Sequence, residues 1–271
     1  MKILGCFKVV PDLDAIVEQD WEVENQRAVD TGYAKLVWNC FDEGALEMML
    51  RLSEFSEGLN VVFQLSALTV GREKTEGFLK TLYALGFSEG VRICVEEERE
   101  LLFSPEWVSG LIAAYVEKIA MQDVVLTGTQ SSDGSNQKTP YLLAERLGWP
   151  CISQVVGIEP VDGEHLKVVS QVSGGRMVQQ VKTPCVLAVG NAPCAYLRIP
   201  TLRDKMKLGK RPVTRFAPEE LCRDKGNGGL QLAALNPIDR KRNTILIDKG
   251  SPEENARCLY EEYLKERLSA L

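Results

Sequence analysis

Short apolar runs alternate with segments of helical period through the first 150 residues of the chain. Apolar runs bounded by turn residues predict strands at Lys2–Val10, Asn60–Val70, Gly90–Val95 and Asp123–Leu126. Apolar positions three or four residues apart predict helices at Glu43–Glu54, Glu73–Leu85, Pro105–Met121 and Thr139–Leu147. Strands that alternate with helices in this way indicate an α/β fold with a doubly wound, mostly parallel sheet.

The pattern changes after Cys151. Three runs with alternating apolar positions follow, and the dipeptides Asp162-Gly163 and Gly174-Gly175 separate them as turns. These runs predict a small antiparallel set of strands at Ile152–Ile158, Leu166–Val172 and Met177–Val181. A further apolar run, Pro184–Gly190, is expected to return to the main sheet.

The part of the chain from Arg198 onward begins with a basic segment, and a segment with charges of both signs follows. Segment Arg198–Pro212 is rich in Arg and Lys, and two interpretations stay open: a solvated helix face, or a docking element with Leu202 and Met206 as apolar anchors. Segment Arg215–Lys241 resembles a poorly packed arm, and Asn243–Asp248 resembles a short strand. We therefore predict an α/β domain over residues 1–200 and a basic segment with a C-terminal arm over 201–271.

The chain ends in a strong helix signal. Ser251 stands at the N-cap position, Pro252 at N1 and Glu254 at N3, the pattern of a capping box. Apolar residues at helical spacing continue to about Leu268. A helix at the end of such an arm is expected to pack on another chain.

Composition excludes several classes of function. The chain has 271 residues, a net charge of −6 and a pI near 5.2, without the basic face that nucleic-acid binding needs. No apolar run has the length of a transmembrane segment. Eight scattered cysteines without a C-x-x-C pair are expected to be reduced core residues of a cytoplasmic protein. The single histidine, His165, excludes a multi-histidine metal centre and disfavours a catalytic triad.

One stretch carries candidate binding chemistry. In Asp123–Pro140 an apolar strand enters a turn of Gly, Ser, Thr and Asn residues, and a helix follows. Unpaired N–H groups in such a loop and at a helix N-terminus bind phosphate, whereas an ordinary capped connection binds nothing. The motif is neither a P-loop nor a G-x-G-x-x-G fingerprint, but it exceeds the roughly 2–6 residues of a plain connection. Both interpretations stay open on composition alone.

Taken together, four segments resemble the beta subunit of electron-transfer flavoproteins. They are the start Met1–Asp12, the stretch Asn39–Glu47, the loop Gly128–Gln137, and the signature Gly174–Leu187 followed by Ile199–Lys207. The likeness covers nearly the whole chain, including the final helix start. Three departures accompany it: Cys40 replaces a frequent proline, Thr129 replaces a frequent basic residue, and Ser170-Gln171 replaces an acidic and basic run.

The resemblance implies a Rossmann-like fold that binds an adenine nucleotide, either AMP or a second FAD, beside an alpha subunit that carries the redox FAD. Together the two subunits would pass electrons from an acyl-CoA-type or other flavin dehydrogenase to an acceptor. Such a chain is an electron-carrier subunit rather than a self-contained catalyst, without catalytic or metal-binding residues of its own. By matching position, the nucleotide site would comprise Cys6, Asn39, Cys40, Phe41, Asp42, Val70, Gly128, Thr129, Gln130, Ser131, Ser132, Asp133, Gly134, Ser135, Asn136 and Gln137. Partner docking would use Thr201, Leu202 and Met206.

Two other hypotheses stay open. The departure at Ser170-Gln171 is compatible with a nucleotide-binding scaffold or sensor that does not transfer electrons. A nucleotide-hydrolysing enzyme of the same fold class is disfavoured, because the loop has no phosphate-binding lysine motif and Asp133 is its only carboxylate.

Overall fold

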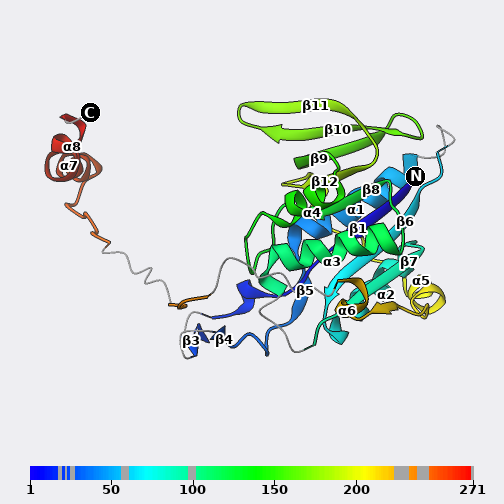
Figure 1. The fold of residues 1–271 in the computed structure, drawn as a ribbon. Helices are drawn as coiled ribbons and strands as arrows, with labels where there is room; N and C mark the ends of the chain where they lie inside the picture. Colours follow the sequence, from blue (N-terminus) through cyan, green and yellow to red (C-terminus); the bar gives the residue numbers. More distant parts are fainter. Residues whose placement is uncertain are drawn as a thin grey trace.

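The computed structural model describes residues 1–17, 20–21, 23–24, 28–55, 61–96, 102–222, 232–236 and 244–269. Its centre is a nine-stranded sheet in the order β11-β10-β9-β12-β8-β1-β6-β7-β13 (Figure 1). The strands of this sheet are β1 (Lys2–Cys6), β6 (Gln64–Gly71), β7 (Glu89–Cys94), β8 (Val124–Gly128), β9 (Cys151–Pro160), β10 (His165–Val172), β11 (Gly175–Lys182), β12 (Cys185–Val189) and β13 (Thr214–Phe216). The predicted α/β class is confirmed.

Strand β1 lies between β6 and β8 and is parallel to both. The chain builds outward from β1 through β6 and β7, and then returns to the other side of β1 with β8 and β12. This reversal creates a topological switch point at the carboxyl ends of β1 and β8, the place where open α/β sheets bind ligands.

Helices cover both faces of the sheet. The helices are α1 (Cys40–Glu54), α2 (Glu76–Ala84), α3 (Pro105–Lys118), α4 (Thr139–Leu147), α5 (Leu202–Leu208) and α6 (Pro218–Leu221), and η4 (Glu73–Thr75) is a 3-10 turn before α2. The core on one face includes the apolar side of α1 and α2, and the core on the other face includes α3 and α4. Strands β1, β8 and β12 are almost continuously apolar because both of their faces are buried.

The antiparallel set is confirmed. Strand β10 pairs antiparallel with both β9 and β11, and Gly174 supplies the positive φ of +85° that the turn into β11 requires. The first six residues of β10 alternate between half-buried and buried, as expected for a sheet with one face toward the core. Strand β12 then returns beside β8 in parallel, as the apolar run 184–190 predicts.

Several predicted boundaries differ from the structure. The single strand predicted at Lys2–Val10 is in fact two strands, because the chain leaves the main sheet after Phe7, whose N–H donates to Leu68. Strand β2 (Val9–Pro11) instead pairs with β5 (Leu36–Trp38), and the turn η1 (Leu13–Ala15) follows it. A further small pair joins β3 (Val23–Glu24) to β4 (Ala28–Val29).

The interpretation of 215–241 as an arm is wrong for its first residues. Strand β13 pairs in parallel with β7 and extends the main sheet, and Leu221 of α6 is buried. Residues 244–248 do not form the strand that the sequence predicts. The helix signal at Ser251 is confirmed, since its side chain accepts the Glu254 N–H at 3.2 Å.

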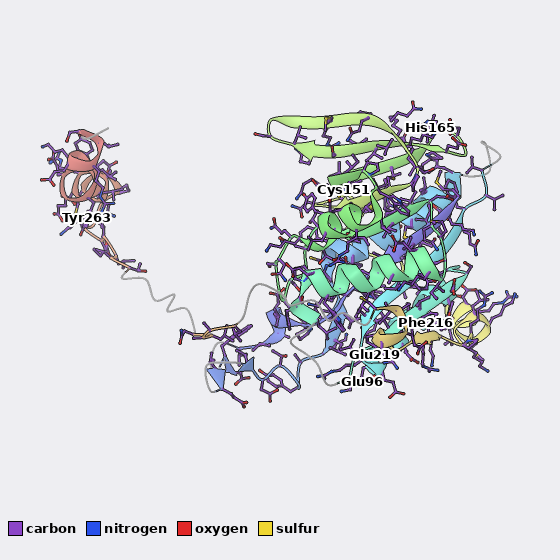
Figure 2. All side chains as sticks on the ribbon, viewed as in Figure 1. Glu96, Cys151, His165, Phe216, Glu219 and Tyr263 are labelled. Atoms are coloured by element: carbon purple, nitrogen blue, oxygen red, sulfur yellow. The ribbon has the colours of Figure 1, made fainter. Side chains whose placement is uncertain are left out.

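The C-terminal helical segment consists of α7 (Pro252–Cys258), a π-helical stretch (Leu259–Leu264) and α8 (Lys265–Ser269). Figure 1 shows this segment apart from the sheet, and Figure 2 shows Tyr263 on it. Leu259, Tyr260 and Leu268 are exposed on it. Among the described helices, none is both long and apolar enough to cross a membrane.

Candidate functional site

A pocket with a cavity volume of about 110 Å³ opens at the carboxyl ends of β1, β6 and β8, at the switch point of the sheet. This volume is smaller than the roughly 300–1,000 Å³ of typical small-molecule sites. Its lining combines apolar side chains with amides, hydroxyls, one carboxylate and two lysines. The lining residues are Cys6, Phe7, Lys8, Asn39, Asp42, Leu68, Val70, Val108, Ile112, Thr127, Gly128, Thr129, Gln130, Ser131, Asn136, Gln137, Lys138, Thr139 and Pro140.

Asp42, in the first turn of α1, connects three sides of this pocket. Its carboxylate accepts the backbone N–H of Gly128 at 2.6 Å and that of Lys8 at 2.8 Å, and the amide of Asn39 at 2.9 Å. Burial raises the pKa of Asp42 to about 6, while the three N–H donors favour its charged form. The side chain therefore joins the ends of β1 and β8 to the start of α1.

Asn39 holds the polar loop that follows β8. Its side-chain amide donates to the carbonyl of Gln130 at 2.7 Å, and its oxygen accepts the N–H of Ser132 at 3.1 Å. Ser135 and Gln137 have positive φ values of +49° and +56°, an uncommon backbone conformation for residues other than glycine. The loop is thus held in one conformation by α1 rather than by its own composition alone.

The start of α4 follows this loop and lines the pocket. Lys138, Thr139 and Pro140 line the pocket, and Lys138 at the N-cap position makes no side-chain capping bond. N–H groups at a helix start have no intrahelical acceptor and lie at the positive end of the helix dipole. Together with the loop, this helix start can bind a phosphate group through the main chain.

Lys8 brings a positive charge to the pocket. Its ammonium group lies 2.8 Å from the carboxylate of Asp133 and 4.3 Å from the ring centre of Phe103. Asn136 donates its side-chain amide to the Phe103 carbonyl at 2.9 Å. These contacts join the segment before α3 to the polar loop, and the Lys8 ammonium that lines the pocket is paired with Asp133.

Most of the residues predicted from the sequence come together here. Ten of the sixteen line the pocket, namely Cys6, Asn39, Asp42, Val70, Gly128, Thr129, Gln130, Ser131, Asn136 and Gln137. The other six, Cys40, Phe41, Ser132, Asp133, Gly134 and Ser135, lie in the same two segments without lining it. Of these, Ser132 and Asp133 make the loop contacts described above, and Ser135 donates its hydroxyl to the Ser131 carbonyl at 3.2 Å.

Sequence reasoning missed nine of the lining residues, among them Lys8 and the two residues of α3, Val108 and Ile112. The α3 residues follow the same apolar spacing as the helix's core positions, so no local signal separates them. Lys8 had a signal, because a cation directly after a buried strand stands at the carboxyl edge of the sheet.

Other side-chain chemistry is limited in the part of the chain that the structure describes. No group of three His, Cys, Asp or Glu residues there is arranged to hold a metal ion. His165 lies at the start of β10 and pairs with Asp162 at 3.0 Å (Figure 2). Burial raises the pKa of Cys151 to about 11 and that of Cys185 to about 12, so both thiols stay protonated near neutral pH.

The basic segment forms a separate exposed surface. Helix α5 begins after Thr201, whose hydroxyl accepts the N–H of Asp204 at 3.2 Å. Leu202 is 75% exposed, Met206 64% and the preceding Ile199 87%. Large apolar side chains this exposed on an ordered helix are typical of interaction sites.

Comparison with known proteins identifies the class. The family described as "Electron transfer flavoprotein domain" matches residues 37–221. The Escherichia coli (strain K12) protein YgcR, whose name assigns it to electron transfer flavoprotein subunits, is 30% identical over 275 residues, 99% of each chain. The electron transfer flavoprotein subunit beta of Bacillus subtilis (strain 168) is 26% identical over 260 residues, 92% of this chain and 95% of that one.

A third relative is the acryloyl-CoA reductase electron transfer subunit gamma of Anaerotignum propionicum, 27% identical over 216 residues, 79% of this chain and 76% of that one. The chain therefore belongs to the electron transfer flavoprotein family and is a beta-like subunit. The resemblance seen in the sequence is confirmed.

Proposed function

We propose that this chain is the beta subunit of a heterodimeric electron-transfer flavoprotein and binds AMP or a second FAD in the pocket at the end of β8. Its partner is an alpha subunit that carries the redox FAD. The observation that carries the proposal is the meeting of the polar loop 128–137 with the uncapped start of α4 at the switch point of the sheet.

The residues of the pocket suit an adenine nucleotide. Apolar side chains on one wall, including Leu68, Val70 and Ile112, offer a surface for a purine ring. The polar loop, the start of α4 and the ammonium group of Lys8 offer donors and positive charge for phosphate. An adenosine phosphate thus has complementary surroundings at both of its ends.

Electron transfer requires no catalytic side chain from this subunit. The flavin, when bound, supplies the redox chemistry, and the protein binds it, orients it and controls access of water. The residues that line the pocket hold a nucleotide, and the exposed segment before and within α5 contacts a flavin dehydrogenase. Leu202 is the central anchor of that contact, in agreement with its 75% exposure.

The exposed C-terminal helix suits the alpha subunit. Its apolar residues Leu259, Tyr260 and Leu268 have no cover within the described part of the chain and are 43%, 48% and 54% exposed. An amphipathic helix of this kind is stabilised chiefly by burial of its apolar face. Packing against the alpha subunit provides that burial.

The test is the nucleotide content of the complex. The chain is co-expressed with its alpha partner, the complex is denatured, and the released nucleotides are identified by mass and counted against protein. One flavin and one adenosine phosphate per heterodimer, or two flavins, are expected. A complex without flavin absorbance and without extractable nucleotide contradicts the proposal. Stoichiometric AMP or ATP on the isolated chain, without a flavoprotein partner in pull-downs, favours a nucleotide-binding scaffold.

A further inference from the structure

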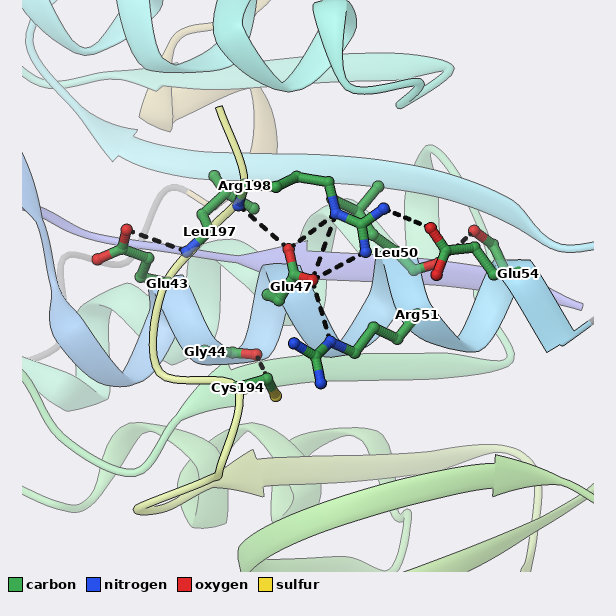
Figure 3. Close-up of polar contacts among 10 residues, drawn as sticks. Glu43, Gly44, Glu47, Leu50, Arg51, Glu54, Cys194, Leu197 and Arg198 are labelled. Atoms are coloured by element: carbon green, nitrogen blue, oxygen red, sulfur yellow. Dashed lines mark hydrogen bonds and ion pairs between the residues drawn. The ribbon is translucent and has the colours of Figure 1, made fainter. Parts of the chain in front are cut away.

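Helix α1 has an acidic face on the side away from the nucleotide pocket. Glu43, Glu47 and Glu54 follow one another at spacings of four and seven residues, which places them on the same side of the helix. The chain segment that precedes α5 runs along this face (Figure 3). Asp42 in the first turn of α1 thus lines the pocket, whereas Glu43, Glu47 and Glu54 contact the segment that leads to the docking surface.

Glu47 and Arg198 form the centre of this contact. The Glu47 carboxylate accepts Nη2 of Arg198 at 2.8 Å, its Nε at 3.1 Å and its backbone N–H at 3.2 Å. Glu54 accepts the remaining guanidinium nitrogen, and Arg51 adds a bond of 3.0 Å to Glu47 from within α1 (Figure 3). The Glu47 side chain is only 4% exposed, so Arg198 is held by a buried, multiply bonded carboxylate.

Neighbouring residues add to the attachment. The N–H of Leu197 donates to the Glu43 carboxylate at 3.1 Å, and the Cys194 thiol lies 3.8 Å from the carbonyl of Gly44. Leu197 itself is buried. Arg198 therefore follows two residues buried against α1, Cys194 and Leu197, and directly precedes the exposed Ile199, although Tyr196 is also 81% exposed.

The opposite end of the docking segment is also attached. The Tyr83 hydroxyl donates to the carbonyl of Pro212 at 2.8 Å, and Arg215 binds the Glu76 carboxylate at 2.7 and 2.8 Å. The stretch from Ile199 to Arg211 is consequently held at both ends, and α5 also packs on α2, while Ile199, Leu202 and Met206 stay exposed. A binding surface ordered before contact loses less conformational entropy on binding.

We propose that Glu47 and Arg198 are positioning residues, which hold the segment 199–206 in the pose that a flavin dehydrogenase binds. The proposal rests on the docking role assigned to Leu202 above. Arg198 fixes the backbone at position 198 to α1, because its guanidinium and its backbone N–H both bind Glu47. Glu47 fixes the segment by binding Arg198. Removal of either partner leaves the other charge without its main bond and releases the segment from α1.

The first measurement is amide hydrogen exchange on the intact alpha–beta complex. Arg198→Ala and Glu47→Gln are expected to raise exchange of residues 196–206 roughly tenfold or more, and to leave the loop 128–137 unchanged. Arg51→Ala is the matched control, because its 3.0 Å bond to Glu47 lies within α1, so the change takes an arginine from Glu47 without taking a hydrogen bond from residues 197–206. Arg198→Lys, which keeps the charge without the forked geometry, is expected to give an intermediate increase and serves if the alanine variant folds poorly.

The second measurement uses a flavin-dependent acyl-CoA dehydrogenase as electron donor. The concentration of complex that gives half-maximal rate should rise roughly 3–10-fold in Arg198→Ala and in Glu47→Gln, with an unchanged maximal rate and nucleotide content. The double variant should add nothing further, because both changes remove one attachment. Additive effects, or no effect of Glu47→Gln, overturn the positioning role. If Leu202→Ala also leaves the half-maximal concentration unchanged, the docking role itself fails, and hydrogen exchange alone then decides whether the attachment exists.

Discussion

Substitution of Gly128, the last residue of β8, tests how closely β8 and α1 approach each other beside the pocket. A Cβ atom at this position would lie 2.6 Å from the Asp42 carboxylate oxygen, 2.6 Å from the Phe41 Cβ and 2.9 Å from the Asp42 backbone nitrogen. Two of these contacts involve Phe41 and Asp42 atoms at or next to the main chain of α1, which cannot rotate away. Gly128→Ala therefore forces β8 and the first turn of α1 apart.

The magnitude follows from these distances. Ordinary contacts of a Cβ atom lie at 3.4–4 Å, so the two elements must separate by close to 1 Å. Overpacking of this kind typically destabilises a protein by about 1–3 kcal/mol. For a chain of this size, that corresponds to a decrease in Tm of roughly 3–10 °C. The same shift disturbs the 2.6 Å bond from the Gly128 N–H to Asp42.

The assay is thermal unfolding followed by circular dichroism, together with the nucleotide content of the purified complex. Gly128→Ala should lower both the Tm and the nucleotide content of the complex. Gly163→Ala is the control, because a Cβ there would have no neighbour within 4 Å and its φ is not positive, so stability should change by less than about 0.5 kcal/mol. A Gly128→Ala protein with the Tm and nucleotide content of the wild type would refute the close approach of β8 and α1.

Three further predictions concern the pocket and the docking surface. Leu202→Ala should raise the half-maximal concentration with a dehydrogenase roughly 30-fold, as a hot-spot residue does, and leave nucleotide content intact; unaltered kinetics would remove its docking role. Gly134→Val should loosen nucleotide binding but keep the fold, because even a Cβ would lie 3.2 Å from the Phe103 ring; unchanged nucleotide content would count against the site. The contribution of Asp42 to stability should be complete below about pH 4 and decrease by up to ~1.4 kcal/mol per pH unit as the pH rises to about 6, because burial raises its pKa from 3.8 to about 6. Urea unfolding across this range should show that decrease in the wild type and not in Asp42→Asn, and an equal decrease in both would contradict it.

The order of strands and helices could be predicted because its signals are local. The helix 139–147 has the predicted bounds, and the positive φ of Gly86 after α2 agrees with a C-terminal glycine. The strand predicted at Lys2–Val10 failed because apolar character does not reveal which partner a strand takes. Phe7 donates to β6, whereas Val9 pairs with Trp38, and only these long-range bonds divide the run in two.

The candidate site also has residues that the sequence predicts and residues that only the tertiary structure adds. The sequence predicts the loop 128–137 and the segment 39–42, because their residue types favour turns and helix starts. Val108 and Ile112 join them only through packing, since nothing in their local sequence distinguishes a pocket wall from a core position. The attachment of Arg198 to Glu47 crosses 151 positions of the chain and lies beyond any local pattern.

By itself, the sequence determined the fold class, the family and the polar loop at the end of the fourth predicted strand. These properties depend on hydrophobic period, turn chemistry and motif spacing, which act over a few residues at a time. The tertiary structure alone decided that Asp42 joins β1, β8 and α1, that Val108 and Ile112 line the pocket, and that α1 also holds the segment that precedes α5. Such contacts form only when the sheet brings distant segments to one edge, because hydrogen bonds and ion pairs act over a few ångströms in space and not along the chain.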